Sequence, residues 1–184
     1  MKYDNKYSIL GGSEITTEHI IGALNIDYIC YPEEYHLSED ACIGYYHKNP
    51  FIYFIAVDSL GNVVGYINFS PITDNKYEEL RSGKYIDTVI TKDDILAYEA
   101  NNKYSVYFSS ICVHPQNRKQ GVATSLIEEL LRFIEELKKQ DIEINRIVAD
   151  AVSDSGYMLL KKLGFSKVRD SSHKTIIMEK VHGT

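Results

Sequence analysis

The segment Arg118-Lys119-Gln120-Gly121-Val122-Ala123 contains the residue types that hold an anion. It joins an apolar strand predicted over residues 106–113 to an amphipathic helix predicted over residues 122–137. The first amides of a helix lack partners within the helix, and together with the helix dipole they attract a phosphate group. Gly121 lets the backbone approach such a group, and the two cations before it add positive charge. The segment therefore predicts a phosphate-binding turn, with a plain strand-to-helix turn as the alternative.

The composition is that of an ordinary globular protein. Of the 184 residues, 44% are hydrophobic and 25% are charged, which predicts one domain over residues 1–184. No stretch approaches the ~20 apolar residues that cross a bilayer, so no membrane partner is expected. The polar start of the chain, residues 1–6, is unlike a secretory signal. These features predict a cytoplasmic protein.

The net charge and the cysteine content indicate which partners and which redox compartment to expect. The formal charge is −6 and no cluster of Lys and Arg is present, which argues against a nucleic-acid partner. An acidic protein better suits a cationic partner such as an amine. Cys30, Cys42 and Cys112 are odd in number and lack the spacing of metal ligands. They predict buried free thiols in a reducing compartment and no metal site.

The first part of the chain is predicted to hold a strand, two helices and a hairpin. The strand lies around residues 7–10, and the helices run through residues 20–28 and 38–46. Two apolar segments, 51–57 and 63–69, flank a turn cluster and form an antiparallel pair that Pro71 is expected to end.

Residues 72–103 are polar, with short helices predicted at 76–81 and 93–100. A connection this long is often functional, and we expect it to be an insertion that forms part of a pocket wall. A strand at 104–113, the helix at 122–137 and a strand at 144–152 then predict a parallel βαβ unit. A helix capped by Ser153 and closed by Gly164, and a last strand at 174–178, complete the order.

Two motifs in this order resemble those of the GNAT superfamily, the Gcn5-related N-acetyltransferases. The central signature of that family is V-x-P-x-x-[QR]-x-x-G-x-[GA], and the segment from Val113 to Ala123 matches every defined position. A short helix that ends in the pair Gly164-Phe165 matches a second signature. The resemblance implies an α/β (α+β) GNAT fold. Its central mixed sheet is mostly antiparallel, with six or seven strands and helices on both faces.

The resemblance also implies acetyl-CoA as a co-substrate. The amides of the turn would then hold its pyrophosphate, with Arg118 alongside, and the strand before the turn would pair with the pantetheine arm. Ser153 stands where many members have an Asn that contacts this arm, and helix capping is the alternative for its shorter side chain. The residues implied to bind the cofactor are Ile111, Cys112, Val113, Arg118, Lys119, Gln120, Gly121, Val122, Ala123, Thr124 and Ser153.

Direct acetyl transfer requires a neutral amine, a stabilised oxyanion and a proton source for the leaving thiolate. By the resemblance, the backbone N–H of Val113 is the oxyanion donor. Many members supply the proton from a Tyr four residues before the Gly of the Gly-Phe pair, but Leu160 stands there. Tyr157 lies about one helical turn earlier and is the candidate replacement, with a packing role as the alternative.

The general base is open. Some histone-acetylating members carry a Glu on the central strand, where this chain has Tyr107. Ser109 and Ser110 lack an identifiable His–Asp partner, which argues against an acyl-serine, and Cys112 is expected to be buried and unreactive. The other candidates are Glu99, Asp87 and His114.

The sequence therefore predicts an N-acetyltransferase that acts by direct attack on a primary amine of a small molecule or peptide. The absence of the usual Tyr leaves a second interpretation, a catalytically weak GNAT-fold module that binds or senses acyl-CoA. The acceptor pocket is expected between the first two helices and residues 72–103. The formation of a homodimer is left open.

Overall fold

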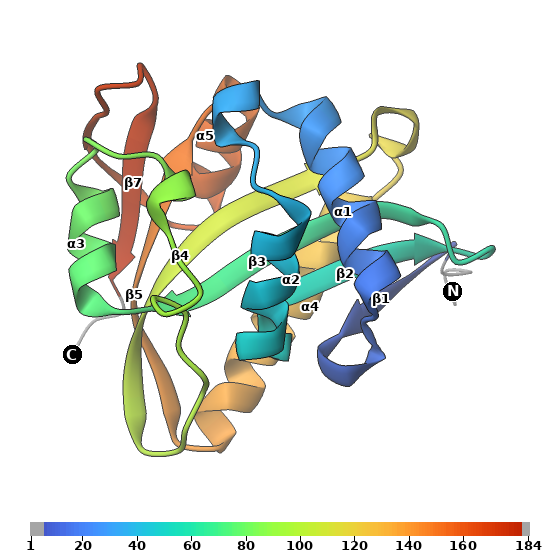
Figure 1. The fold of residues 1–184 in the computed structure, drawn as a ribbon, viewed down its shortest axis with the longest axis horizontal. Coiled ribbons are helices and arrows are strands. Elements are labelled where there is room, and N and C mark those ends of the chain that lie inside the picture. Colours follow the sequence, from blue (N-terminus) through green and yellow to red (C-terminus); the bar gives the residue numbers. More distant parts are fainter. Residues whose placement is uncertain (1–5, 182–184) are drawn as a thin grey trace. The chain divides into compact units, whose positions relative to one another are not determined.

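The computed structural model describes residues 6–181. The prediction about a secretory signal concerned residues 1–6, most of which lie outside the described residues. The described residues form one mixed sheet of seven strands in the order β1-β2-β3-β4-β5-β7-β6 (Figure 1). The neighbours in this sheet whose registers are defined are antiparallel, except for the parallel pair β4 and β5. The fold class predicted from the sequence is therefore confirmed. The strands are β1 (Tyr7–Gly11), β2 (Tyr53–Asp58), β3 (Val63–Ile72), β4 (Asn102–Val113), β5 (Ile142–Ala151), β6 (Ser166–Asp170) and β7 (Ile176–Val181).

The chain divides into two compact units. The first contains the described residues up to Asn68 and Ser110–Glu136, and the second contains Phe69–Ser109 and the described residues from Leu137 onward. The boundaries fall within β3, β4 and the last turn of helix α4, so each of these elements contributes to both units. The five α-helices of the described residues are α1 (Thr17–Cys30), α2 (Glu39–Lys48), α3 (Asp74–Arg81), α4 (Val122–Lys139) and α5 (Asp154–Lys162).

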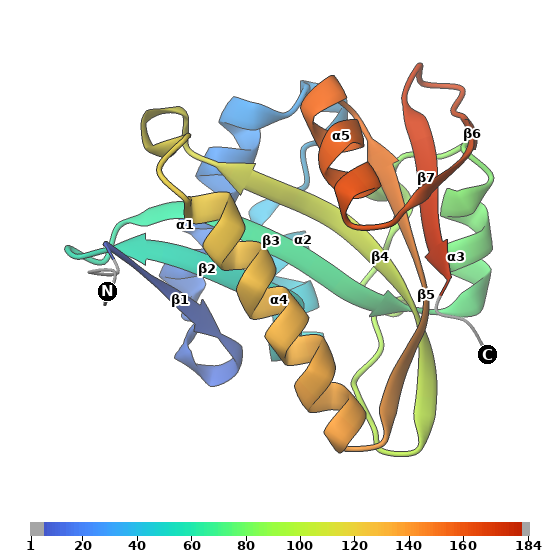
Figure 2. The same cartoon turned by 180° about the vertical axis from the view of Figure 1, so that it is seen from behind.

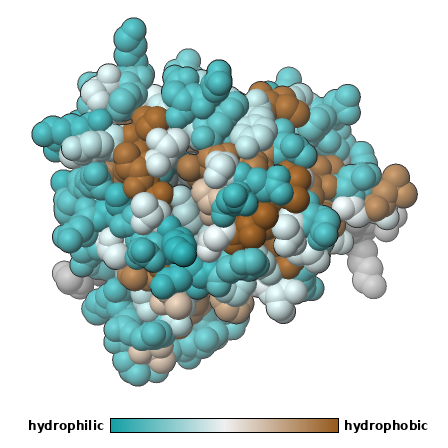
Figure 3. All heavy atoms as spheres, viewed as in Figure 1, coloured by the Kyte–Doolittle hydropathy of each residue, from teal (hydrophilic) through white to brown (hydrophobic). Residues whose placement is uncertain are grey.

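In the first unit, helices cover both faces of the strands. α1 and α2 lie on the face seen in Figure 1, and α4 lies on the opposite face, seen in Figure 2. The predicted apolar face of α4 is buried at Val122, Leu126 and Leu130. Phe133 of the same helix packs against Phe54 of β2, with ring centroids 5.3 Å apart. Figure 3 shows that the face with α1 and α2 carries separate apolar patches interrupted by hydrophilic side chains.

In the second unit, α3 and α5 lie on opposite faces of β5 and β7, as a comparison of Figures 1 and 2 shows. α3 is bound to β7 through Glu179, which accepts hydrogen bonds from Arg81 and Tyr77. α5 ends at Lys162, and Gly164 closes it as predicted, with a φ of 87° that suits the left-handed position after the cap. The amide of Phe165 closes this turn on the carbonyl of Leu160 over 3.0 Å.

Three details of the predicted element order are wrong. Pro71 does not end β3, because the strand continues to Ile72, which bridges Ile95. Residues 93–100 are not helical. The hydroxyl of Tyr104 instead accepts a hydrogen bond from the amide of Glu99 and donates one to the carbonyl of Ala97. The edge strand β6 was not predicted, since it is polar and mostly exposed and pairs with β7 through its backbone.

Candidate functional site

The turn predicted to bind a phosphate lies between β4 and α4. Lys119 and Gly121 have positive φ angles of 62° and 87°, and α4 begins at Val122. The amide of Ser125 donates to the carbonyl of Gly121 over 3.0 Å. The amides of residues 122–124 therefore precede the hydrogen-bond ladder of the helix, as an anion seat at a helix start requires.

Side chains from the same unit hold this turn in place. The Oε1 atom of Gln120 accepts hydrogen bonds from the hydroxyl of Tyr7 at 2.8 Å and from Nζ of Lys6 at 2.7 Å. Its Nε2 atom donates to the carbonyl of Gln116 at 2.9 Å. The turn is thus tied to β1 and to itself, which fixes where its backbone amides point.

Arg118 connects the turn to the end of β4. Its Nε atom donates to the carbonyl of Val113 at 3.2 Å, and its Nη2 atom lies 3.5 Å from Sγ of Cys30. The two segments predicted to hold the cofactor, 111–113 and 118–124, are therefore joined by this guanidinium. Its predicted place beside the pyrophosphate stays a prediction.

The cysteines differ from the sequence prediction. Cys30, the last residue of α1, and Cys112 of β4 form a disulfide with Cα atoms 6.8 Å apart, whereas Cys42 is buried and forms no disulfide. The prediction of three free thiols is therefore wrong for two of them. Pairing depends on a contact between residues 82 positions apart, which cysteine spacing did not indicate. The inference of a reducing compartment loses this support.

A chain of three polar side chains crosses the interior of the first unit. The hydroxyl of Tyr66 on β3 donates to the carboxylate of Asp27 on α1, and Ser110 on β4 hydrogen-bonds to the same Tyr66 oxygen. Burial raises the pKa of Asp27 above its ordinary value of 3.8, although the hydrogen bond from Tyr66 opposes the shift. Sequence reasoning included Ser110 among the candidates but missed Asp27 and Tyr66, since no local pattern links α1 to β3.

The loop after α1 adds a contact to the adjacent strand residue. The hydroxyl of Tyr31 donates to the carbonyl of Ile111 over 3.4 Å. Nε2 of His36 lies 2.8 Å from the carbonyl of Tyr31. The predicted pantetheine-binding segment is thus contacted by Tyr31, which lies between the two helices expected to form part of the acceptor pocket.

In the second unit, the predicted site residues lie at the start of α5. Ser153 caps the helix, with its Oγ accepting from the amide of Gly156 at 3.1 Å, so the capping alternative is observed. Tyr157 is half-buried one turn into the helix, and Leu160 is buried. A contact of Ser153 with a cofactor and the role of Tyr157 as an acid both stay predictions.

Two of the candidate bases, Ser109 and Asp87, are in contact in the second unit. The hydroxyl of Ser109 donates to Oδ2 of Asp87 at 3.0 Å, and Asp87 is buried. Tyr107, two residues earlier, is buried as well, whereas Glu99 is exposed. Asp150 on β5 is a third carboxylate here. Burial raises its pKa, against the opposing effects of a hydrogen bond from Thr175 and the charge of His173.

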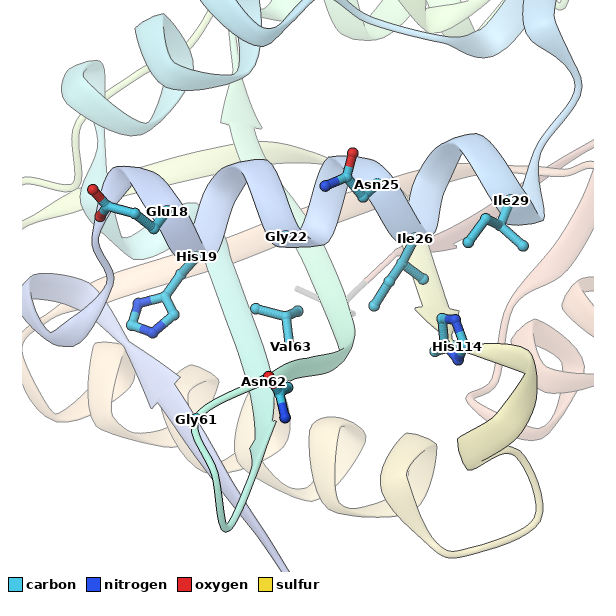
Figure 4. A pocket seen from close by; sticks show the side chains of 10 residues that line it. All are labelled: Glu18, His19, Gly22, Asn25, Ile26, Ile29, Gly61, Asn62, Val63 and His114. Carbon is cyan, nitrogen blue, oxygen red and sulfur yellow. The ribbon is translucent and has the colours of Figure 1, made fainter.

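A groove of about 430 Å³ runs along α1 in the first unit (Figure 4). Val63 from the β2–β3 hairpin faces Ile26 of α1 across it, and His19 and His114 flank these apolar side chains. Gly22 allows the close approach, because a Cβ there would lie 2.7 Å from a methyl carbon of Val63. His114, a candidate base, is partly exposed directly after the end of β4, and its Nδ1 accepts a hydrogen bond from the amide of Gln116.

Within residues 6–181, no group of three or more His, Cys, Asp or Glu side chains could hold a metal ion. Over the same part of the chain, no helix combines the length and apolar character needed to span a membrane.

Comparison with known proteins identifies the class to which this fold and turn belong. Residues 20–165 match the model of the acetyltransferase (GNAT) family, and the chain belongs to that family. No curated protein sequence matches the chain at a significant level.

Solved structures share the fold at low sequence identity. The loading GNATL domain of CurA from Lyngbya majuscula is 13% identical and has a TM-score of 0.70, covering 95% of this chain and 97% of its own. Ard1 from Thermoplasma volcanium is 13% identical, with a TM-score of 0.62 and coverage of 97% and 99%. A NatC complex bound to Gag peptide and CoA contains a chain that is 13% identical, with a TM-score of 0.66 and coverage of 97% and 99%.

Proposed function

We propose that this protein is an N-acetyltransferase that transfers the acetyl group of acetyl-CoA to a primary amine of a small molecule or peptide. The observation that carries the proposal is the turn between β4 and α4, with positive φ angles at Lys119 and Gly121 before the start of a long helix, in a chain of the GNAT family. The NatC structure of the same fold contains CoA and a peptide, which supports this donor and this class of acceptor.

The residues of the turn fit the diphosphate of CoA. Successive amides at the start of a long helix provide donors and a favourable dipole, and the open surroundings of Gly121 leave room for an anion. Arg118 and Lys119 are exposed at the same turn and contribute positive charge. When bound, acetyl-CoA supplies an activated thioester.

The remaining roles follow from the chemistry of direct transfer. The amine nitrogen attacks the thioester carbon, a C–N bond forms and the C–S bond breaks. The amide of Val113 is the proposed donor to the oxyanion, and the hydroxyl of Tyr157 is the proposed proton source for the thiolate. In a crystal soaked with CoA, a Tyr157 hydroxyl within ~3.5 Å of the sulfur would support this role, and a greater separation would argue against it.

One observation favours a second function. Leu160 occupies the usual position of the acid and is 6% exposed, so it provides an apolar surface and no proton. A module that binds acyl-CoA without turnover would meet this description. Thiol release from acetyl-CoA with a panel of amines and peptides separates the two: release supports the enzyme, and tight binding without release supports the module.

The binding turn is tested by Gly121→Glu, which places a carboxylate where the diphosphate is proposed to bind. We expect calorimetry with acetyl-CoA to show an affinity at least 100-fold weaker than that of the wild type, because like charges meet at the helix start. Gly61→Glu is a matched control, since Gly61 has a φ of 84° and equally open surroundings in the β2–β3 turn. Equal affinities in the two variants would contradict the proposed site.

A further inference from the structure

The three hydrogen-bonded polar side chains inside the first unit have no role in the function proposed above. We infer that Ser110, Tyr66 and Asp27 form a proton relay that carries a proton away from the acceptor amine. The inference rests on the proposed function, because it requires that an amine is the acceptor.

The contacts define the direction of the relay. Ser110 hydrogen-bonds to the phenolic oxygen of Tyr66, and the Tyr66 hydroxyl donates to a carboxylate oxygen of Asp27. The relay therefore ends on a group that is acceptor-only when ionised. Tyr66 is 4% exposed, so the middle of the relay is shielded from solvent.

The position of Ser110 connects the relay to the proposed reaction. Ser110 is partly exposed and directly precedes residues 111–113, the segment proposed to hold the acyl arm. The hydroxyl of Tyr31 binds the next residue, Ile111, at its carbonyl. A cationic amine near this strand would meet the Ser110 hydroxyl, the phenol of Tyr31 and the carboxylate behind them.

The proton balance is complete without a further reactant. An ammonium group gives a proton to Oγ of Ser110 while Ser110 passes its own to Tyr66 and Tyr66 passes its own to Asp27. The amine becomes neutral, Asp27 becomes a neutral acid, and Ser110 and Tyr66 end unchanged. The amine then attacks, and the second proton that nitrogen loses balances the one that the thiolate gains. Asp27 returns its proton to solvent.

The surroundings of Asp27 suit this task. Besides the hydrogen bond from Tyr66, the charge of His36 in the loop after α1 lowers the pKa of Asp27. The charge of Asp27 in turn raises the pKa of Tyr28 in the same helix. Tyr31, in the same loop as His36, raises the pKa of Tyr66 through an electrostatic effect. Burial raises the pKa of Asp27 and so narrows the gap between the carboxylate and the ammonium, which makes the carboxylate a better base.

The test uses the full chain with acetyl-CoA and the amine of the panel that reacts fastest. We expect Asp27→Asn to lower kcat/KM by about 100-fold or more at pH 6.5, the range for loss of a general base. At a pH above the pKa of the acceptor the amine is already neutral, so the deficit should nearly vanish. A purely structural role would give a deficit that does not depend on pH.

Further variants test the connection between the three groups. Tyr66→Phe and Ser110→Ala should each repeat the pH-dependent deficit, and combining either with Asp27→Asn should add little, as for residues that act as a unit. Ser110→Thr keeps the hydroxyl and should retain most activity. Asp40→Asn, at an exposed position in the first turn of α2, is the matched control and should behave as the wild type.

The possible failures are distinguishable. A pH-independent deficit in Asp27→Asn, or fully additive losses in the double variants, would overturn the relay while the acetyltransferase function stands. An absence of thiol release with every amine would overturn the proposed function, and the relay with it.

Discussion

At the scale of single residues, the buried carboxylate of Asp27, proposed as the end of the proton relay, should reduce stability at neutral pH. Burial raises its pKa above 3.8. The native state therefore holds more protons than the unfolded state between the unfolded and native pKa values, and stability falls as the pH rises through that window. A difference of one between the native and unfolded pKa values corresponds to about 1.4 kcal/mol of stability. We expect Asp27→Asn to be at least as stable as the wild type at pH 7 in urea unfolding, with the gain lost near pH 3.

Asp58 provides a control of opposite sign. Hydrogen bonds from the side chain and backbone of Asn62 lower the pKa of this exposed carboxylate in the β2–β3 turn. Its stabilising effect is present at neutral pH and is lost as the pH falls through its native pKa. Asp58→Asn should therefore be less stable than the wild type at pH 7. A loss of stability in Asp27→Asn of the same kind would refute the assignment of Asp27.

At the scale of elements, Gly22 sets the distance between α1 and β3. A Cβ at this position would lie 2.7 Å from a methyl carbon of Val63, closer than packed atoms allow. We expect Gly22→Ala to destabilise the protein by about 1–3 kcal/mol, the cost of overpacking, although Ala favours helices by ~1 kcal/mol. Urea unfolding measures the change.

Two variants separate packing from helix propensity. Gly44 lies within α2, and a Cβ there meets no atom within 4 Å. Gly44→Ala should therefore stabilise the protein by up to ~1 kcal/mol. Adding Val63→Ala to Gly22→Ala should recover part of the lost stability, whereas simple additivity of the two changes would show that the close contact is not the cause.

At the scale of the whole molecule, the disulfide between Cys30 and Cys112 constrains the unfolded chain. It closes a loop between residues 82 positions apart, so its removal should cost about 2–5 kcal/mol. We expect reductant, or the double variant Cys30→Ser and Cys112→Ser, to lower the urea midpoint. Thiol titration of the unfolded, unreduced protein should detect one thiol, that of Cys42. Three thiols and no effect of reductant would contradict the bond.

Local patterns predicted most of the elements and the turn between β4 and α4. The period of apolar residues in α4 and the continuous apolar segments of the β2–β3 hairpin follow from which side chains must be buried. The turn at Gly121 and the start of α4 could also be predicted, because amides at a helix start depend on nearest neighbours in the chain, whereas its binding of a phosphate stays a prediction. The errors at Pro71 and residues 93–100 arose where tertiary contacts outweighed local preference.

The sequence by itself thus determined the family, the order of the main elements and the position of the turn at the start of α4, since each depends on short-range spacing. Only the tertiary structure joined Asp27 to Tyr66 and Ser110 and Cys30 to Cys112, because packing of α1 against the strands creates these contacts between residues far apart in sequence. The physical reason is that a buried carboxylate acquires its pKa and its proton partner from neighbours that the fold supplies.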